Sequence, residues 1–202
     1  SRLEVENSFI NYFSKKTEIY KGMKLIDEKL GGTTPLEVIL KFSKKKELKA
    51  DQEDDFEDWG EDEEKNNDKY WFTKDKIDKI ANVHNYLDSL PQVGKVLSFS
   101  SIIDVATLLN NNKPLGTLEM GVLYSKIPES IKIEIIDPYI SIKDNEARIN
   151  LRIIDSQENL RRNELIKKIK YDLKNKLNLK EDEYKLAGVL ILFNNLLQSL
   201  FK

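Results

Sequence analysis

The stretch "YISIKDNEARINLRIID" (139–155) carries the clearest structural signal in the chain. Its second half alternates strictly, with Ala147, Ile149, Leu151 and Ile153 on one side of an extended backbone and Arg148, Asn150 and Arg152 on the other. This period of two is typical of a β-strand with one buried face. The stretch therefore predicts two strands joined at Asp144-Asn145.

Upstream of this stretch, the chain begins with alternating strand and helix patterns. "TPLEVILKF" (34–42) alternates in the same way and predicts another strand. Just before it, apolar residues recur at the spacing of one helix face: Ile19, Met23, Ile26 and Leu30. Gly31 and Gly32 end this helix, because glycine readily adopts the left-handed conformation that follows many helices. With a short strand-like start at Leu3 and Val5, these segments predict a β-α-β beginning.

The middle of the chain predicts helices around a short strand. Thr73 is a candidate N-cap for a helix that Pro91 closes. "VGKVLSF" (93–99) is typical of a short strand. Ser101 and Asp104 have the spacing of a capping box for the helix that follows.

The C-terminal part completes an α+β pattern. It predicts helices at 117–127 and 161–177 and a final strand at 184–193. We expect two small split-βαβ, ferredoxin-like subdomains packed together, with an acidic loop insertion. The first subdomain spans 1–99, with the acidic loop at about 44–68. The second spans 100–202, so the boundary falls near 98–102.

Composition excludes several classes of protein. The 202 residues include 33 Lys and Arg and 35 Asp and Glu, for a formal net charge of −2. The chain therefore lacks the basic excess that nucleic-acid binding usually needs. It contains no cysteine, which rules out disulfides, zinc–thiolate sites and a cysteine nucleophile. No window of sequence holds the roughly 18 apolar residues of a membrane-spanning helix, and no signal-peptide pattern is found at the N-terminus.

Residues 44–68 are the strongest compositional anomaly, with a run of carboxylates from Asp51 to Glu64. Clustered carboxylates can bind Ca²⁺, but "DDFEDWGEDEE" (54–64) lacks the ligand spacing of a calcium loop. We interpret the run as a solvated, self-repelling loop without a metal. Phe56 and Trp59 within it indicate contact with an apolar surface, either of this domain or of a partner.

Candidate catalytic residues are few and form no constellation. His84 is the only histidine, and it lies beside Val83 and Leu87 on a predicted helix, so we interpret it as a helix residue rather than a ligand or base. "GGTTP" (31–35) follows a helix and precedes a strand, the reverse of a phosphate loop. We predict no catalytic, cofactor-binding or metal-binding residues, and no enzyme activity.

The segments "RINLRIID" and "NLRRNEL" bring four arginines close together in sequence: Arg148, Arg152, Arg161 and Arg162. An anion site is one interpretation. The interpretation that we favour is outward strand positions and arginines paired with nearby acids.

Five stretches together resemble a known family. They are "NSFINYF" (7–13), "TEIYKGMKLIDEKLGGTTPLEVILKF" (17–42), "YWFTKDKIDKIANVHNYLDSLPQVGKVLSF" (70–99), "DNEARINLRIIDSQENLRRNEL" (144–165) and "GVLILFNNLLQSLF" (188–201). In order and spacing they resemble the large extracytoplasmic loop of predicted exporters in the resistance–nodulation–division (RND) superfamily. Within that superfamily, the stretches are most similar to the bacterial hydrophobe or lipid exporters grouped with the MMPL proteins.

The resemblance implies a role in transport. Such exporters are integral inner-membrane proteins driven by the proton gradient, with their proton-relaying residues inside the membrane. This chain would be the porter domain on the periplasmic side, guiding a hydrophobic or amphiphilic substrate, such as a lipid, by binding and conformational change. Neither a cofactor nor covalent chemistry is implied, and no residue is assigned to the substrate.

The resemblance also implies the surroundings of the domain. Its partners would be the transmembrane helices and the other porter loop of the same protein, and a homo-oligomer is compatible with this. Of the two extracytoplasmic loops we favour the second. The last stretch would lead into a transmembrane helix, so five apolar residues at helical spacing are expected to be membrane-proximal: Phe193, Leu196, Leu197, Leu200 and Phe201.

The main alternative is a free-standing periplasmic domain that binds a ligand or acts as an adaptor, capturing a lipid or a peptide. An apolar span of about twenty residues directly after Lys202 would favour the exporter. A stop codon there would favour the free domain.

Overall fold

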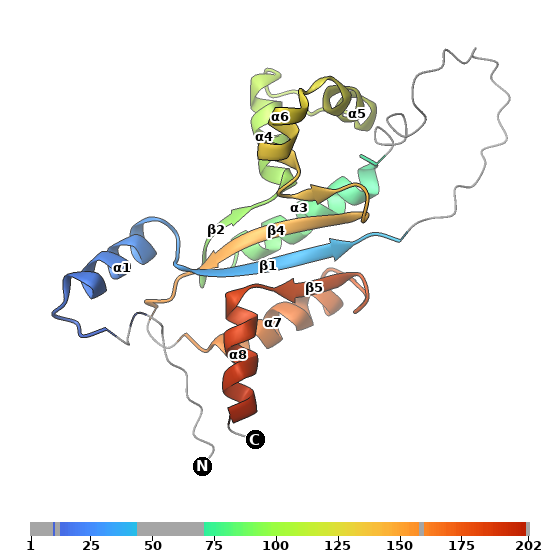
Figure 1. Ribbon diagram of the computed structural model, residues 1–202. Helices are drawn as coiled ribbons and strands as arrows, with labels where there is room; N and C mark the ends of the chain where they lie inside the picture. The colour runs from blue at the N-terminus through green and yellow to red at the C-terminus, as the bar shows by residue number, and fades with distance from the viewer. Residues whose placement is uncertain (1–9, 11–12, 44–70, 158–159, 201–202) are drawn as a thin grey trace, which may run out of the picture.

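The computed structural model describes residues 10, 13–43, 71–157 and 160–200 (Figure 1). The acidic run, which we predict to be a metal-free loop, lies outside the described residues. Helices and strands interleave in this order: α1 (Glu18–Lys29), β1 (Thr34–Lys41), α3 (Lys74–Asp88), β2 (Val93–Leu97), α4 (Phe99–Leu109), α5 (Thr117–Lys126), α6 (Glu129–Ile131), the π-helical turn η2 (Lys132–Ile136), β3 (Ile140–Ser141), β4 (Glu146–Ile153), α7 (Arg162–Asn175), β5 (Tyr184–Ala187) and α8 (Val189–Leu200).

One antiparallel sheet organises these elements, in the order β2-β4-β1-β5, with β3 paired to the start of β4. β1 and β2 both run antiparallel to β4, so β1-α3-β2 is a split βαβ unit with β4 between its strands. The segment β4-α7-β5 repeats this arrangement around β1. The two units therefore interlock within a single sheet.

The α+β class is confirmed, but the strands are arranged differently from our expectation of two packed subdomains. β1 and β2 come from residues 1–99, β4 and β5 come from residues 100–202, and all four join one sheet. The reason is the pairing of β1 with β4 along the whole length of both strands, from Thr34 opposite Ile153 to Lys41 opposite Glu146. This register places the apolar residues of both strands on the same face.

That face, covered by α3 and α7, holds the core. Its strand residues are all buried: Leu36, Val38, Leu40, Ala147, Ile149, Leu151, Ile153 and Leu186. The helices add residues spaced three and four apart, which form one face of each helix: Ile80, Val83 and Leu87 from α3, and Leu165, Ile169 and Leu173 from α7. A hydrogen bond from the Tyr86 hydroxyl to Asp172 (2.8 Å) joins the two helices.

A buried carboxylate anchors α1 to the end of the sheet where β1 begins. Asp27, near the end of α1, is fully buried. It accepts hydrogen bonds from the backbone N–H groups of Asp155 (3.0 Å) and Ser156 (2.7 Å), just beyond β4, and from the hydroxyl of Thr33 (2.6 Å). The last turn of α1 is thereby fixed to the C-terminal end of β4.

Glycines allow the backbone to pass closely at this point. Gly31 and Gly32 have φ angles of 78° and 95°, which confirms that they end the helix. A Cβ atom on Gly32 would lie 2.5 Å from the carbonyl oxygen of Ile153, and one on Gly94 would lie equally close to the carbonyl carbon of Gly31. Larger residues would therefore push α1 and β2 away from the sheet.

Between β2 and β3 the chain leaves the sheet and forms a helical insertion, α4 to η2 (residues 99–136). Its first helix is capped by Ser98, whose hydroxyl accepts from the N–H of Ser100 (3.1 Å) and whose N–H donates to the hydroxyl of Ser101 (3.3 Å). The expected capping pair, Ser101 with Asp104, is wrong because the helix already begins at Phe99. In Figure 1 the insertion stands at the top of the molecule, away from α8.

The C-terminal segment differs from the single strand expected at 184–193. The strand β5 ends at Ala187, because Gly188 has a φ of 104° and turns the chain into α8. The helical spacing expected from Phe193 onward thus starts four residues earlier, at Val189. Among the described residues, no helix is long and apolar enough to cross a membrane.

Candidate functional surface

The helical insertion carries an unusual amount of uncovered apolar side chain. Its large aliphatic residues that are between 39% and 80% exposed, here called the insertion surface, are Val105, Leu108, Leu109, Leu118, Val122, Leu123, Ile131, Ile133 and Ile135. Single exposed aliphatic residues are normal on a protein surface, but a concentration of this kind is typical of a site that contacts a partner or an apolar ligand.

The insertion is nevertheless packed on its inner side. Phe72 lies 5.5 Å from Phe99 and 5.1 Å from Tyr124, measured between ring centroids. Met120 and Ile136 are buried in the same core cluster. These contacts fix α4, α5 and η2 against the start of α3, so the outer apolar residues are held on an ordered scaffold.

The insertion lies at the opposite end of the sheet from α1 and α8. β3 pairs with the first residues of β4, Ile140 opposite Ala147, and leads directly out of the insertion. At the other end, the N–H of Ile10 donates to Asp155 (3.4 Å) after β4. β5 ends with Ala187 opposite Glu37, near the start of β1, and α8 follows at once. Figure 1 shows the two ends of the sheet clearly.

The residues expected to be membrane-proximal belong to α8 and the residue directly after it. Phe193, Leu196, Leu197 and Leu200 lie in this helix, and Leu196 is 54% exposed. The side chains of the other three are not among those described, and Phe201 lies outside the described residues. Leu192, one turn earlier, is also exposed, whereas Leu190 is buried. The first turn of α8 thus packs on the core through Leu190, whereas Leu192 and Leu196 are exposed apolar residues later in the helix.

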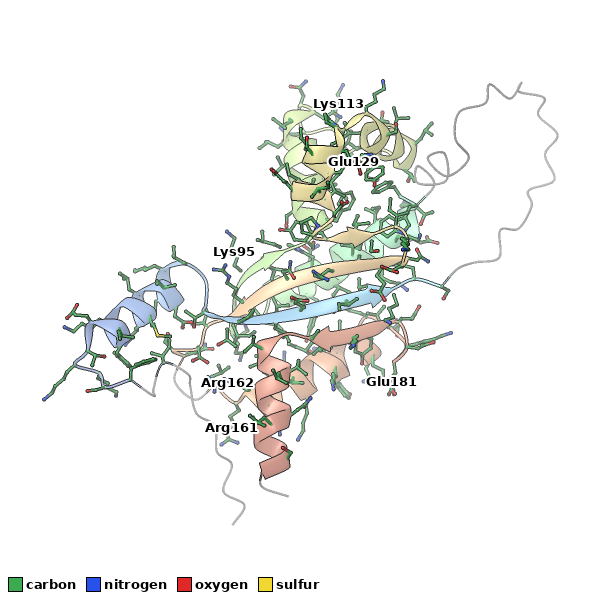
Figure 2. The ribbon with its side chains drawn as sticks, viewed as in Figure 1. Lys95, Lys113, Glu129, Arg161, Arg162 and Glu181 are labelled. Atoms are coloured by element: carbon green, nitrogen blue, oxygen red, sulfur yellow. The ribbon has the colours of Figure 1, made fainter. Side chains whose placement is uncertain are left out.

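The four arginines separate into different environments. Arg148 and Arg152 lie on the face of the sheet opposite α3 and α7. Arg161 pairs with Glu164 (2.8 Å), and Arg162 pairs with Asp155 in the interior. Figure 2 shows Arg161 and Arg162 near the start of α7, with Lys95 elsewhere, beside β2. A joint anion site of all four arginines is therefore not formed, and three of them have acidic partners, as we favoured.

Sequence reasoning missed Lys95, which the structure places next to Arg152. The two residues are direct partners across β2 and β4. Only the register of the sheet could reveal this, because 57 positions separate the two residues in the chain.

His84 is a helix residue of α3, as expected. Its Nδ1 atom lies 2.9 Å from the hydroxyl of Ser98, which already caps α4. Ser98 is fully buried, so its hydroxyl is not accessible to a substrate. The pair therefore joins α3 to the start of the insertion.

Two buried polar clusters join elements of the fold. Burial by itself would raise the pKa of Asp172, but Tyr86, Lys176 and Lys168 outweigh it and hold that pKa below its ordinary value. Burial, and then Asp172, raise the pKa of Tyr86. Asp172 therefore stays charged at neutral pH and links α7 to α3.

The second cluster closes the turn between β3 and β4. Lys76 donates to the side-chain oxygen of Asn145 (2.7 Å) and lies over the ring of Trp71, 4.5 Å from its centroid. Trp71 donates to the same oxygen (3.0 Å). Burial lowers the pKa of Lys76. Asn145 has a φ of 55°, which fits the turn predicted at Asp144-Asn145.

Other candidate sites are weaker. A cavity of about 320 Å³ lies between Gln92 and the start of α7. The charges that line it are largely paired, Arg161 with Glu164 and Lys168 with Asp172. In the part of the chain that the structure describes, no three metal-ligating side chains come together.

Comparisons with known proteins identify no relative. No family model matches the chain, and neither a curated protein nor a solved structure shows significant similarity to it.

Proposed function

We propose that this chain is a porter domain of a proton-driven RND-type exporter, on the periplasmic side of the inner membrane. Its insertion surface contacts the hydrophobic part of an amphiphilic substrate during export. The role is binding and conformational change, without covalent chemistry. The observation that carries the proposal is the insertion surface itself, nine large aliphatic side chains left uncovered on an ordered scaffold.

Two further observations support this assignment. The exposed Leu192 and Leu196 on α8 suit a segment close to a membrane. The insertion lies at the other end of the sheet from α8. With α8 at the membrane, the insertion surface projects away from the bilayer, toward the substrate path and the other porter loop.

The test is binding of an apolar fluorescent dye, N-phenyl-1-naphthylamine, to the 202-residue chain. The triple variant Leu108→Ser, Leu109→Ser, Leu118→Ser removes the three most exposed side chains of the insertion surface. We expect its dye affinity to fall at least about tenfold, which corresponds to about 1.4 kcal/mol of lost contact. The control for loss of an exposed leucine elsewhere is Leu25→Ser, because Leu25 is 58% exposed on α1 and lies outside the insertion surface.

The same triple variant, placed in the full-length exporter, should slow proton-driven export of an amphiphile from proteoliposomes. A free-standing binding domain would bind the dye, but no proton-driven export would depend on the three leucines. Absence of saturable dye binding, or an equal loss in Leu25→Ser, would contradict the proposal.

A further inference from the structure

No described element covers the face of the sheet opposite α3 and α7, and this face is positively charged. This open face includes Glu37, Ile39, Lys41, Lys95, Leu97, Glu146, Arg148, Asn150, Arg152 and Lys185. The charged residues among them are five cations and two acids. All five cations are exposed, so the face presents an excess of three positive charges to solvent.

The two acids account for two of the cations. Arg148 lies 3.6 Å from Glu37, and Lys41 lies 3.2 Å from Glu146. Among the described residues, Lys95, Arg152 and Lys185 have no acid within ion-pair distance. The excess charge is therefore concentrated on three side chains of β2, β4 and β5.

Two of these three cations oppose each other directly. Lys95 and Arg152 are cross-strand partners on β2 and β4, and like charges in this position destabilise a sheet. The turn after α1 packs against the stem of Lys95, because a Cβ atom on Gly31 would lie 3.1 Å from the Cβ of Lys95. The fold thus holds two cations together at a cost that a bound anion would remove.

The surroundings of this pair suit an amphiphile. Leu97, the next residue of the open face on β2, is 38% exposed. Ile39 lies half-buried between Arg148 and Lys185. Leu97 therefore offers an apolar contact close to the cationic pair, and Ile39 offers another further along the face.

We propose that the open face binds the phosphate headgroup of an amphiphilic substrate, with Arg152 and Lys95 as its ligands. A guanidinium can donate two parallel hydrogen bonds to phosphate oxygens, and an ammonium adds a compact charge beside it. This inference rests on the proposed function and specifies the substrate as an anionic amphiphile. The pair lies near the end of β4, whereas the insertion surface lies at the opposite end of the sheet, so the headgroup site is separate from the insertion surface.

The experiment measures binding of short-chain lipids to the 202-residue chain by titration calorimetry, below their critical micelle concentrations. Dihexanoyl phosphatidic acid should bind, whereas dihexanoyl phosphatidylcholine and inorganic phosphate should bind at least tenfold more weakly. The double variant Arg152→Gln, Lys95→Gln should lose at least tenfold in affinity for the phosphatidic acid. Lys113→Gln, on the insertion and remote from Lys95 in Figure 2, is the control for loss of a surface cation and should bind normally.

Stability measurements separate ligand binding from a structural role. Without ligand, Lys95→Gln should unfold at the same temperature or higher, because it removes a like-charge contact, whereas a structural role would lower the midpoint. The inference is overturned if phosphatidic acid binds no better than phosphatidylcholine, if inorganic phosphate binds equally well, or if Lys113→Gln has the same effect. Binding that appears only after deletion of residues 51–64 would also overturn it, by assigning the face to the chain's own acidic run.

The dye measurement distinguishes this failure from failure of the proposed function. If headgroup selectivity is absent but dye binding is intact, only the headgroup inference is contradicted. Loss of dye binding with intact headgroup selectivity would remove the insertion surface and leave the headgroup site standing.

Discussion

Ile149 in β4 and Leu109 in α4 are both large aliphatic residues in regular structure, yet Ile149 is fully buried and Leu109 is 80% exposed. The elements that surround the two residues also differ. The sheet around Ile149 is covered by α3 and α7, whereas the outer residues of the insertion are covered by no described element. The same residue type is therefore part of the core in the sheet and part of the surface in the insertion.

This comparison indicates where the free energy of folding originates. Burial of an aliphatic side chain contributes about 1.5–3 kcal/mol, and an exposed one contributes little. The sheet with α3 and α7 should therefore account for most of the stability. The insertion surface can change with little penalty to the stability of the fold.

The largest effect is expected from truncation in the sheet. Ile149→Ala should lower the free energy of unfolding by about 2–5 kcal/mol, because it leaves a cavity among fully buried neighbours. Leu109→Ala, its counterpart on the insertion, should change it by less than about 0.5 kcal/mol. Urea denaturation of both variants measures the difference. Similar losses in the two would show that the insertion surface is part of the core.

A smaller loss is expected at the anchor of α1. Asp27→Ala leaves the buried N–H of Asp155 without its acceptor and should cost about 1–3 kcal/mol. Although burial opposes it, hydrogen bonds from Thr33, Ser156 and Asp155 lower the pKa of Asp27 below its ordinary value of 3.8. The contribution of the carboxylate is therefore complete above pH 5 and declines as the pH falls through 3.8 toward the folded-state pKa.

The measurement is the stability difference between the wild-type chain and Asp27→Ala as a function of pH. This difference should be constant from pH 7 to 5 and shrink below about pH 4. Asp172 titrates in both proteins, so its effect cancels. A difference that grows toward low pH would mean that Asp27 is protonated in the folded protein.

Local patterns predicted the elements well, because they depend on neighbouring residues. The alternation in β1 and β4, the apolar stripe of α3 and the glycines after α1 all follow from spacing alone. The end of β5 was missed, since "GVLILF" (188–193) is apolar throughout and its period is ambiguous. In the structure the positive φ of Gly188 ends the strand and turns the chain into α8.

Long-range pairing could not be predicted in the same way. The interlocking of the two βαβ units depends on β1 meeting β4 across more than 100 residues. The same pairing places Arg152 beside Lys95, and no local pattern contains that information. The insertion helices show a further limit, because an apolar stripe has the same spacing whether another element covers it or not.

The smallest effect on stability is expected from the exposed leucines of α8, a helix that contains both a buried leucine and exposed ones. Leu190 is 1% exposed, whereas Leu192 and Leu196 are 72% and 54% exposed. The double variant Leu192→Ser, Leu196→Ser should therefore change the free energy of unfolding by less than about 0.5 kcal/mol, whereas Leu190→Ala should cost about 2–5 kcal/mol.

The same double variant should have a clear effect on membrane contact. If this part of α8 lies at a bilayer, removing two exposed leucines should weaken binding of the 202-residue chain to phospholipid vesicles, measured by co-flotation. Leu25→Ser, on α1, is the control for general loss of apolar surface. A destabilisation as large as that of Leu190→Ala, with unchanged vesicle binding, would make the outer side of α8 part of the core and remove the argument that it is membrane-proximal.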